Sequence, residues 1–197
     1  MDAVQKLMSE LANKIEKLSE WSGRVVSWLT LMMVLLVFVV VVLRYAFNIG
    51  SIELQESITY LHGMIFLLAA SFTLKEDEHV RVDVFYSAMS HQKRAWVDLM
   101  GTLVFLFPVC IYIFTMSLDY VLLSWRIGEA SGEAGGLPAL YLLKSLILIM
   151  PILMMLQGLA WIIRRVLYLF GGAESPYKSI STELHPDNIE ADTGVQQ

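Results

Sequence analysis

The feature that most constrains this chain is a run of nineteen residues without a charge, between Arg24 and Arg44. An α-helix of that length spans about 28 Å, at roughly 1.5 Å per residue. This length is close to the hydrocarbon thickness of a bilayer, about 30 Å. Charged residues also make up only 17% of the chain, whereas soluble domains carry about a quarter. We therefore predict a membrane protein whose first transmembrane helix covers residues 25–43.

Three further apolar runs predict additional spans, at about residues 57–74, 99–118 and 139–165. The first two of these contain no charged residue, and the third is uncharged from Ser145 to Ile163. Runs of this length and composition are typical of transmembrane helices rather than of buried strands. The sequence therefore predicts an all-α membrane protein with four transmembrane helices.

The basic residues predict how these spans are oriented. Eleven Lys and Arg lie before the first span, between the second and third, and after the fourth, whereas three lie in the two remaining connections. Because cytoplasmic segments are enriched in Lys and Arg, we expect both termini in the cytoplasm. Loops 44–56 and 119–144 then face outward, and the membrane domain covers residues 23–172.

The two ends of the chain differ from this membrane domain. Residues 1–22 have an apolar stripe at helical spacing, which predicts an amphipathic helix: Val4, Leu7, Met8, Leu11, Ile15 and Leu18. Such a helix either anchors in the cytoplasmic interface or docks on a partner, and the pattern allows both. Residues 173–197 hold five acids against one lysine, and we predict a disordered acidic tail there.

A charged turn and a second amphipathic helix are expected after the second span. Apolar side chains at Val82, Phe85, Tyr86 and Met89 predict a helix that lies along the membrane. His79 and Asp83 fall in this turn, and a metal or proton site is one interpretation. Because two ligands do not make a metal site, we expect a structural hydrogen bond instead.

The short outer connection contains a candidate ion pair. Asn48 tolerates the left-handed backbone that ends a helix, and Ser51 can cap the next one. Glu53 and Glu56 then lie in the first turns of the second helix, where the helix dipole favours anions. Arg44 is positioned to pair with one of them, within the chain or across a subunit contact. The alternative is that Arg44 extends to the outer headgroups.

A lysine near the start of the fourth span, Lys144, needs a partner. Lys144 lies six residues after Pro138, which places it about 9 Å along the helix and slightly below the outer surface. A cation at that depth requires an anionic partner or must extend to the interface. We predict that Lys144 takes part in an outer ion pair.

The predicted spans lack the side chains of a transport path or a redox centre. A carrier that works alone usually places ionisable groups near the midplane, and His62 is the only histidine within any predicted span. Two axial haem ligands are therefore not available, and we expect His62 to be a hydrogen-bonded packing residue. We predict no catalytic residue, no metal and no cofactor in this chain, and no binding to nucleic acid.

Several motifs, taken in order, resemble the small membrane subunit (Q-type) of tripartite ATP-independent periplasmic (TRAP) transporters. They are the end of the first span, Leu43 to Asn48, the acidic start of the second helix, and the turn from Glu78 to Asp83. The segment from Gly136 to Lys144 is similar to the branch grouped with mannitol or chloroaromatic-acid systems. Residues 52–56 lack that branch's aromatic and adjacent acid pair, so the partner of Arg44 stays open.

The resemblance implies a non-catalytic subunit in a bacterial inner membrane. Its partners would be a large membrane subunit, which carries an organic acid driven by sodium, and a periplasmic substrate-binding protein. The implied role is to pack on the immobile scaffold of the large subunit. The expected structural and partner contacts are Arg44, Tyr45, Phe47, Asn48, Glu53, Glu56, Lys144, and His79 and Asp83 at the inner turn. The alternatives are a free-standing small transporter and a membrane anchor of a redox complex.

Overall fold

The computed structural model describes residues 3–77, 86, 89–173, 175 and 177. Its elements are α1 (Ala3–Phe47), α2 (Ile52–Lys75), α4 (His91–Gly101), the π-helical turn η1 (Thr102–Leu106), α5 (Phe107–Ile127) and α6 (Leu140–Gly171). Four helical stretches are long and apolar enough to cross a membrane, with α4, η1 and α5 forming one of them. The predicted all-α fold with four membrane-spanning helices is confirmed.

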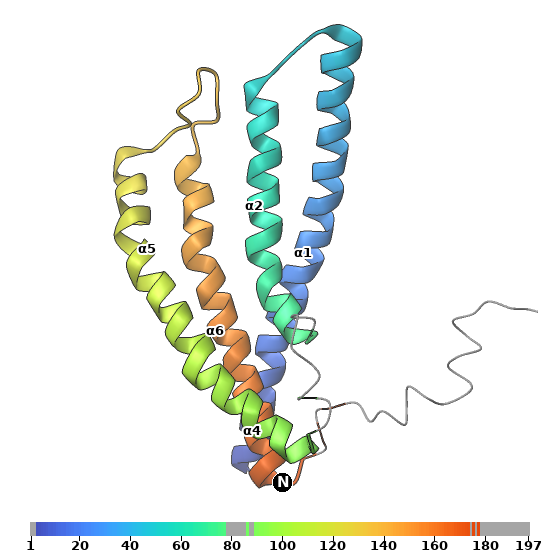
Figure 1. The fold of residues 1–197 in the computed structure, drawn as a ribbon, viewed down its shortest axis with the longest axis vertical. Helices are drawn as coiled ribbons and strands as arrows, with labels where there is room; N and C mark the ends of the chain where they lie inside the picture. The colour runs from blue at the N-terminus through green and yellow to red at the C-terminus, as the bar shows by residue number, and fades with distance from the viewer. Residues whose placement is uncertain (1–2, 78–85, 87–88, 174, 176, 178–197) are drawn as a thin grey trace, which may run out of the picture.

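The helices form two antiparallel pairs that are close at one end and spread apart at the other (Figure 1). The pairs are α1 with α2 and α5 with α6, and α6 also contacts α1, α2, α4 and η1. We refer to the spread end, with the α1–α2 turn and the α5–α6 loop, as the outer end. The opposite end, where the N-terminus lies, is the inner end. These names follow the orientation that the basic residues predict.

Helix α1 is longer than the sequence analysis expected, because it runs without a break from Ala3 to Phe47. The expected boundary between residues 22 and 23 lies inside this helix. Gly23 is buried there, and a Cβ atom at this position would come 2.6 Å from the ring of Phe72 on α2. The missing side chain therefore allows close packing of α1 on α2 rather than a change of direction.

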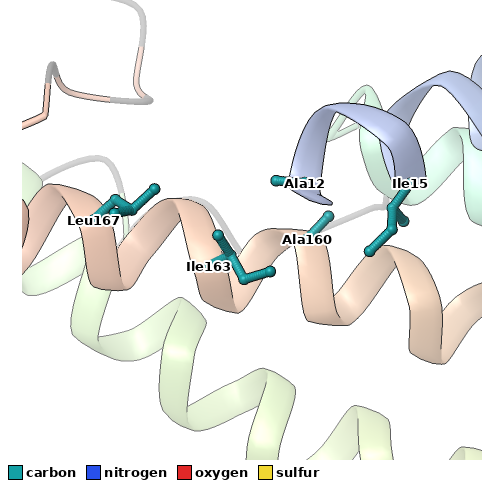
Figure 2. Close-up of a cluster of buried hydrophobic side chains, with 5 residues drawn as sticks. All are labelled: Ala12, Ile15, Ala160, Ile163 and Leu167. Atoms are coloured by element: carbon teal, nitrogen blue, oxygen red, sulfur yellow. The ribbon is translucent and has the colours of Figure 1, made fainter. Parts of the chain in front are cut away.

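The inner half of α1 packs on the chain's own α6. Ala12 and Ile15 contact Ala160, Ile163 and Leu167 in a buried apolar cluster (Figure 2). Small side chains on both helices allow the two backbones to approach closely, as is common in membrane helix contacts. One flank of the predicted amphipathic stripe is thus covered by α6, whereas its other flank remains exposed: Val4, Leu7, Leu11 and Leu18.

The third membrane-crossing stretch contains a π-helical turn next to Pro108. Pro108 has no backbone N–H to donate to the preceding turn. It is the second residue of α5, and η1 ends two residues before it, at Leu106. A Cβ atom added to Gly158 of α6 would come 2.8 Å from Leu106. The widened turn therefore lies where α6 presents no side chain.

The helix predicted from Val82, Phe85, Tyr86 and Met89 falls mostly outside the described residues.

Two predicted helix ends are confirmed. Asn48 has a positive φ of 56° after the end of α1, and the Ser51 hydroxyl accepts a hydrogen bond from Leu54 N–H (3.3 Å) at the start of α2. Helix α6 ends at Gly171, and Gly172 adopts the left-handed conformation with φ 65°. Asn48 and Gly172 both have this left-handed backbone conformation, which asparagine and glycine tolerate better than most other residues do.

Candidate functional site

The residues predicted to contact a partner at the outer end of α1 are exposed. Arg44, Tyr45, Phe47 and Asn48 all face away from the rest of the chain, and Tyr45 is 80% exposed. Among the described residues, Arg44 forms no ion pair. Glu53 is exposed as well. The described part of the chain thus supplies no partner for Arg44, and the prediction of a contact across subunits stays open.

Glu56 is held by the loop between α5 and α6 rather than by Arg44. Its carboxylate accepts a hydrogen bond from the Ser131 hydroxyl and another from Leu137 N–H, at 2.6 Å. Two donors on one carboxylate fix the loop against the start of α2. The loop is irregular and rich in glycine, so no sequence periodicity indicated which of its residues would reach Glu56.

Lys144 forms an ion pair with a residue that the sequence analysis did not identify. Its Nζ lies 2.5 Å from Glu129 Oε2 and 4.0 Å from the ring centre of Tyr120. Lys144 is only 9% exposed, so the carboxylate and the ring replace water around the ammonium group. The hydrogen bond from Lys144 lowers the pKa of Glu129. The pair links the α5–α6 loop to α6 at the outer end.

The inner end carries a buried ion pair that the sequence analysis missed. Asp98 of α4 and Arg165 of α6 are 9% and 7% exposed, with Arg165 Nη2 3.2 Å from Asp98 Oδ2. In sequence, these residues lie at the edges of two predicted spans. The position of a charge at a span edge indicates depth, but it does not reveal which helix the side chain faces.

Two further inner ion pairs connect α1 to its neighbours. Arg164 donates to both oxygens of Glu16, at 2.9 and 2.7 Å, and also to Asn13 Oδ1 at 2.7 Å. Lys75, at the end of α2, lies 3.3 Å from Glu20. The charged face of the predicted amphipathic helix therefore binds other helices of this chain.

A small polar layer lies between α1, α2 and α6. The Ser19 hydroxyl donates to Gln157 Oε1 at 2.7 Å, and the Ser22 and Ser71 hydroxyls are 3.4 Å apart. All four side chains are buried. Interhelical hydrogen bonds of this type hold membrane helices together where apolar attraction between helices is weak.

The remaining predicted residues do not form a chemical centre in the described part of the chain. His79 and Asp83 lie outside the described residues. His62 is exposed on α2 and makes no hydrogen bond to a described residue, so the prediction of a hydrogen-bonded packing residue was wrong. Within the described ranges, no group of three His, Cys, Asp or Glu residues could hold a metal ion.

The described residues therefore form an exposed outer tip on α1 and ion pairs that fasten the helices to one another. Residues 33–167 match the family described as tripartite ATP-independent periplasmic transporters, DctQ component. Neither a curated protein nor a solved structure matches the chain. Because the match covers more than half of the chain, this protein belongs to the DctQ family of TRAP transporter components.

Proposed function

We propose that this chain is the small subunit that packs on, and stabilises, the scaffold of the large TRAP membrane subunit in the bacterial inner membrane. In this proposal the large subunit carries an organic acid with sodium, and the small subunit performs no catalysis. Both termini are cytoplasmic, as the distribution of Lys and Arg predicts.

The observation that carries the proposal is the outer half of α1. Along this half, a narrow stripe of partly covered side chains faces α2, and the rest is exposed: Leu31, Met32, Val34, Leu35, Phe38 and Val41. Lipid can cover such a surface equally well. At the outer tip, Arg44, Tyr45 and Asn48 offer a cation, a hydroxyl and an amide that no described residue of this chain binds. We propose that the large subunit binds these groups, rather than the outer headgroups.

The α5–α6 loop is the second surface in this proposal. Glu56 and the Lys144–Glu129 pair fasten both ends of the loop to the membrane helices. A fastened loop presents one shape to the outside, which lowers the entropic cost of binding. We propose that it helps to dock the periplasmic substrate-binding protein.

The test is co-purification of the large subunit with the tagged small subunit from native membranes in mild detergent. We expect wild-type protein to recover the large subunit in a one-to-one ratio. Arg44→Glu should reduce recovery about tenfold or more, because a charge reversal at a contact removes an attraction and adds a repulsion. Arg126→Glu is the matched control, since Arg126 is also exposed and lies at the outer end of α5.

Recovery of the chain alone, with transport activity after reconstitution, would overturn the proposal in favour of a free-standing transporter. A haem or quinone absorbance in the purified protein would instead favour a redox anchor. Equal recovery of the large subunit with Arg44→Glu and Arg126→Glu would keep the assembly but remove Arg44 from the contact.

A further inference from the structure

The buried ion pair at the inner end accepts hydrogen bonds from two tyrosines, and one of them, Tyr177, lies beyond the last helix. The Asp98 carboxylate accepts hydrogen bonds from Arg165 Nε and Nη2, at 3.3 and 3.2 Å. The Arg165 guanidinium lies 4.2 Å from the ring centre of Trp161, which covers one of its faces. A buried pair of this kind is stable only when further hydrogen bonds satisfy its remaining oxygen lone pairs.

Two tyrosine hydroxyls supply those hydrogen bonds. Tyr86 OH lies 3.0 Å from each oxygen of Asp98, and Tyr177 OH donates to Asp98 Oδ2 at 2.7 Å. The ring of Tyr177 also lies 5.5 Å from the guanidinium of Arg165. Tyr177 comes six residues after the end of α6 at Gly171, so a residue beyond the last helix contributes to this pair.

A second contact joins another residue beyond α6, Ser175, to the start of α4. Ser175 Oγ lies 3.0 Å from His91 Nδ1, and the rings of His91 and Tyr177 are 5.7 Å apart. His91 and Asp98 are seven residues apart, and this spacing places them on one face of the helix. Ser175 and Tyr177 therefore contact one side of α4 at two points, nearly two turns apart.

We propose that Ser175 and Tyr177 form a C-terminal latch that closes the Asp98–Arg165 pair and holds α4 against α6. By holding one side of α4, the latch also fixes the orientation of the opposite side of this helix. Trp96, Val97 and Met100 are exposed on that side. The rings of Trp96 and Phe170, which lies on α6, pack edge to face with centroids 6.1 Å apart. The end of α6 therefore supports both sides of α4. Burial raises the pKa of Tyr177, and its hydroxyl remains a hydrogen-bond donor.

The first test is cross-linking in inner-membrane vesicles that contain the full chain. The only cysteine is removed by Cys110→Ala, and Ser175→Cys is combined with either His91→Cys or Lys93→Cys. We expect a short bifunctional thiosulfonate to cross-link residues 175 and 91 several-fold more efficiently than residues 175 and 93. Lys93 is on α4 but exposed, which makes it the matched control. Equal yields, or no cross-link with residue 91, would overturn the latch.

The second test removes one hydroxyl and measures deuterium uptake by the amides of α4 in the purified protein. Tyr177→Phe should speed uptake about tenfold, since a hydrogen bond to a charged group is lost. Tyr168→Phe is the same chemical change on α6, at a hydroxyl without a hydrogen-bond partner among the described residues. Uptake that is equally slow in both variants would show that Tyr177 does not hold α4, and the proposal would fail.

Discussion

The inner and outer halves of this molecule are stabilised differently. At the inner end, α1, α2, α4 and α6 meet around buried polar and apolar contacts. Among them are Asp98 of α4 with Arg165 of α6, and Ser19 of α1 with Gln157 of α6. At the outer end the helix pairs spread apart (Figure 1), and no residue in the most hydrophobic window of α1 is buried. The inner half is therefore supported by contacts within this chain, whereas most of the outer half of α1 is exposed.

The comparison also shows what marks an assembly surface in a membrane protein. Apolar exposure carries little information there, because lipid covers apolar side chains at little cost. Polar groups carry more, since each needs a partner at that depth or must reach the interface. In the inner half the buried charges have partners within the chain, whereas Arg44 at the outer tip has no ion-pair partner among the described residues.

The largest effect should come from breaking the inner ion pair. Arg165→Met leaves the Asp98 carboxylate buried without its cation, and a loss of about 3–5 kcal/mol in the free energy of unfolding is expected. Thermal unfolding in detergent would measure it. The double variant Asp98→Leu with Arg165→Met removes both charges and should recover part of the stability, because the Tyr86 and Tyr177 hydroxyls lose their acceptor. A double variant as unstable as the single one would contradict this account of the pair.

A smaller effect is expected from filling the close contact between α1 and α2. Gly23→Ala places a Cβ atom 2.6 Å from the ring of Phe72, and overpacking of this kind costs about 1–3 kcal/mol. Gly101→Ala is the matched control, because nothing lies within 4 Å of a Cβ atom at this helical position. The control should be neutral or stabilising by up to about 1 kcal/mol. Unfolding temperatures that rise in both variants would contradict close packing at Gly23.

The smallest of these effects concerns the outer pair and depends on pH. The pKa of Glu129 is lowered from its usual value of 4.5 by Lys144, so the pair contributes its full stability above about pH 4.5. This contribution is lost as the pH falls through the lower pKa of the folded state. The unfolding temperature of Glu129→Gln should thus lie below that of wild type at neutral pH and approach it in acid. Glu133→Gln, in the same loop and exposed, should follow wild type throughout.

The sequence was sufficient for the architecture because the membrane simplifies it. A helix that crosses a bilayer needs about 20 apolar residues, and each predicted span corresponds to one of the observed helices. Local signals also located the end of α1 and the start of α2, through Asn48 and Ser51. Helix α1 continues through the domain boundary predicted between residues 22 and 23, because a single glycine does not end a helix that packs on its neighbours.

The contacts between helices were harder to predict, for a physical reason. Ion pairs such as Lys144 with Glu129 and Arg164 with Glu16 join segments whose relative rotation depends on packing. Charge position along a helix is visible in the sequence, but the azimuth of a side chain relative to a distant helix is not. The need of Lys144 for a partner could therefore be predicted, whereas the identity of Glu129 could not.

The most direct test of the account is photo-crosslinking of the small subunit in native membranes. A photoreactive phenylalanine analogue is placed at Phe38 on α1, Phe66 on α2 or Phe105 on η1, which are 65%, 71% and 71% exposed. The account predicts that Phe38 gives the strongest adduct with the large membrane subunit. An adduct from Phe66 or Phe105, with none from Phe38, would contradict the claim that the outer half of α1 is the assembly surface.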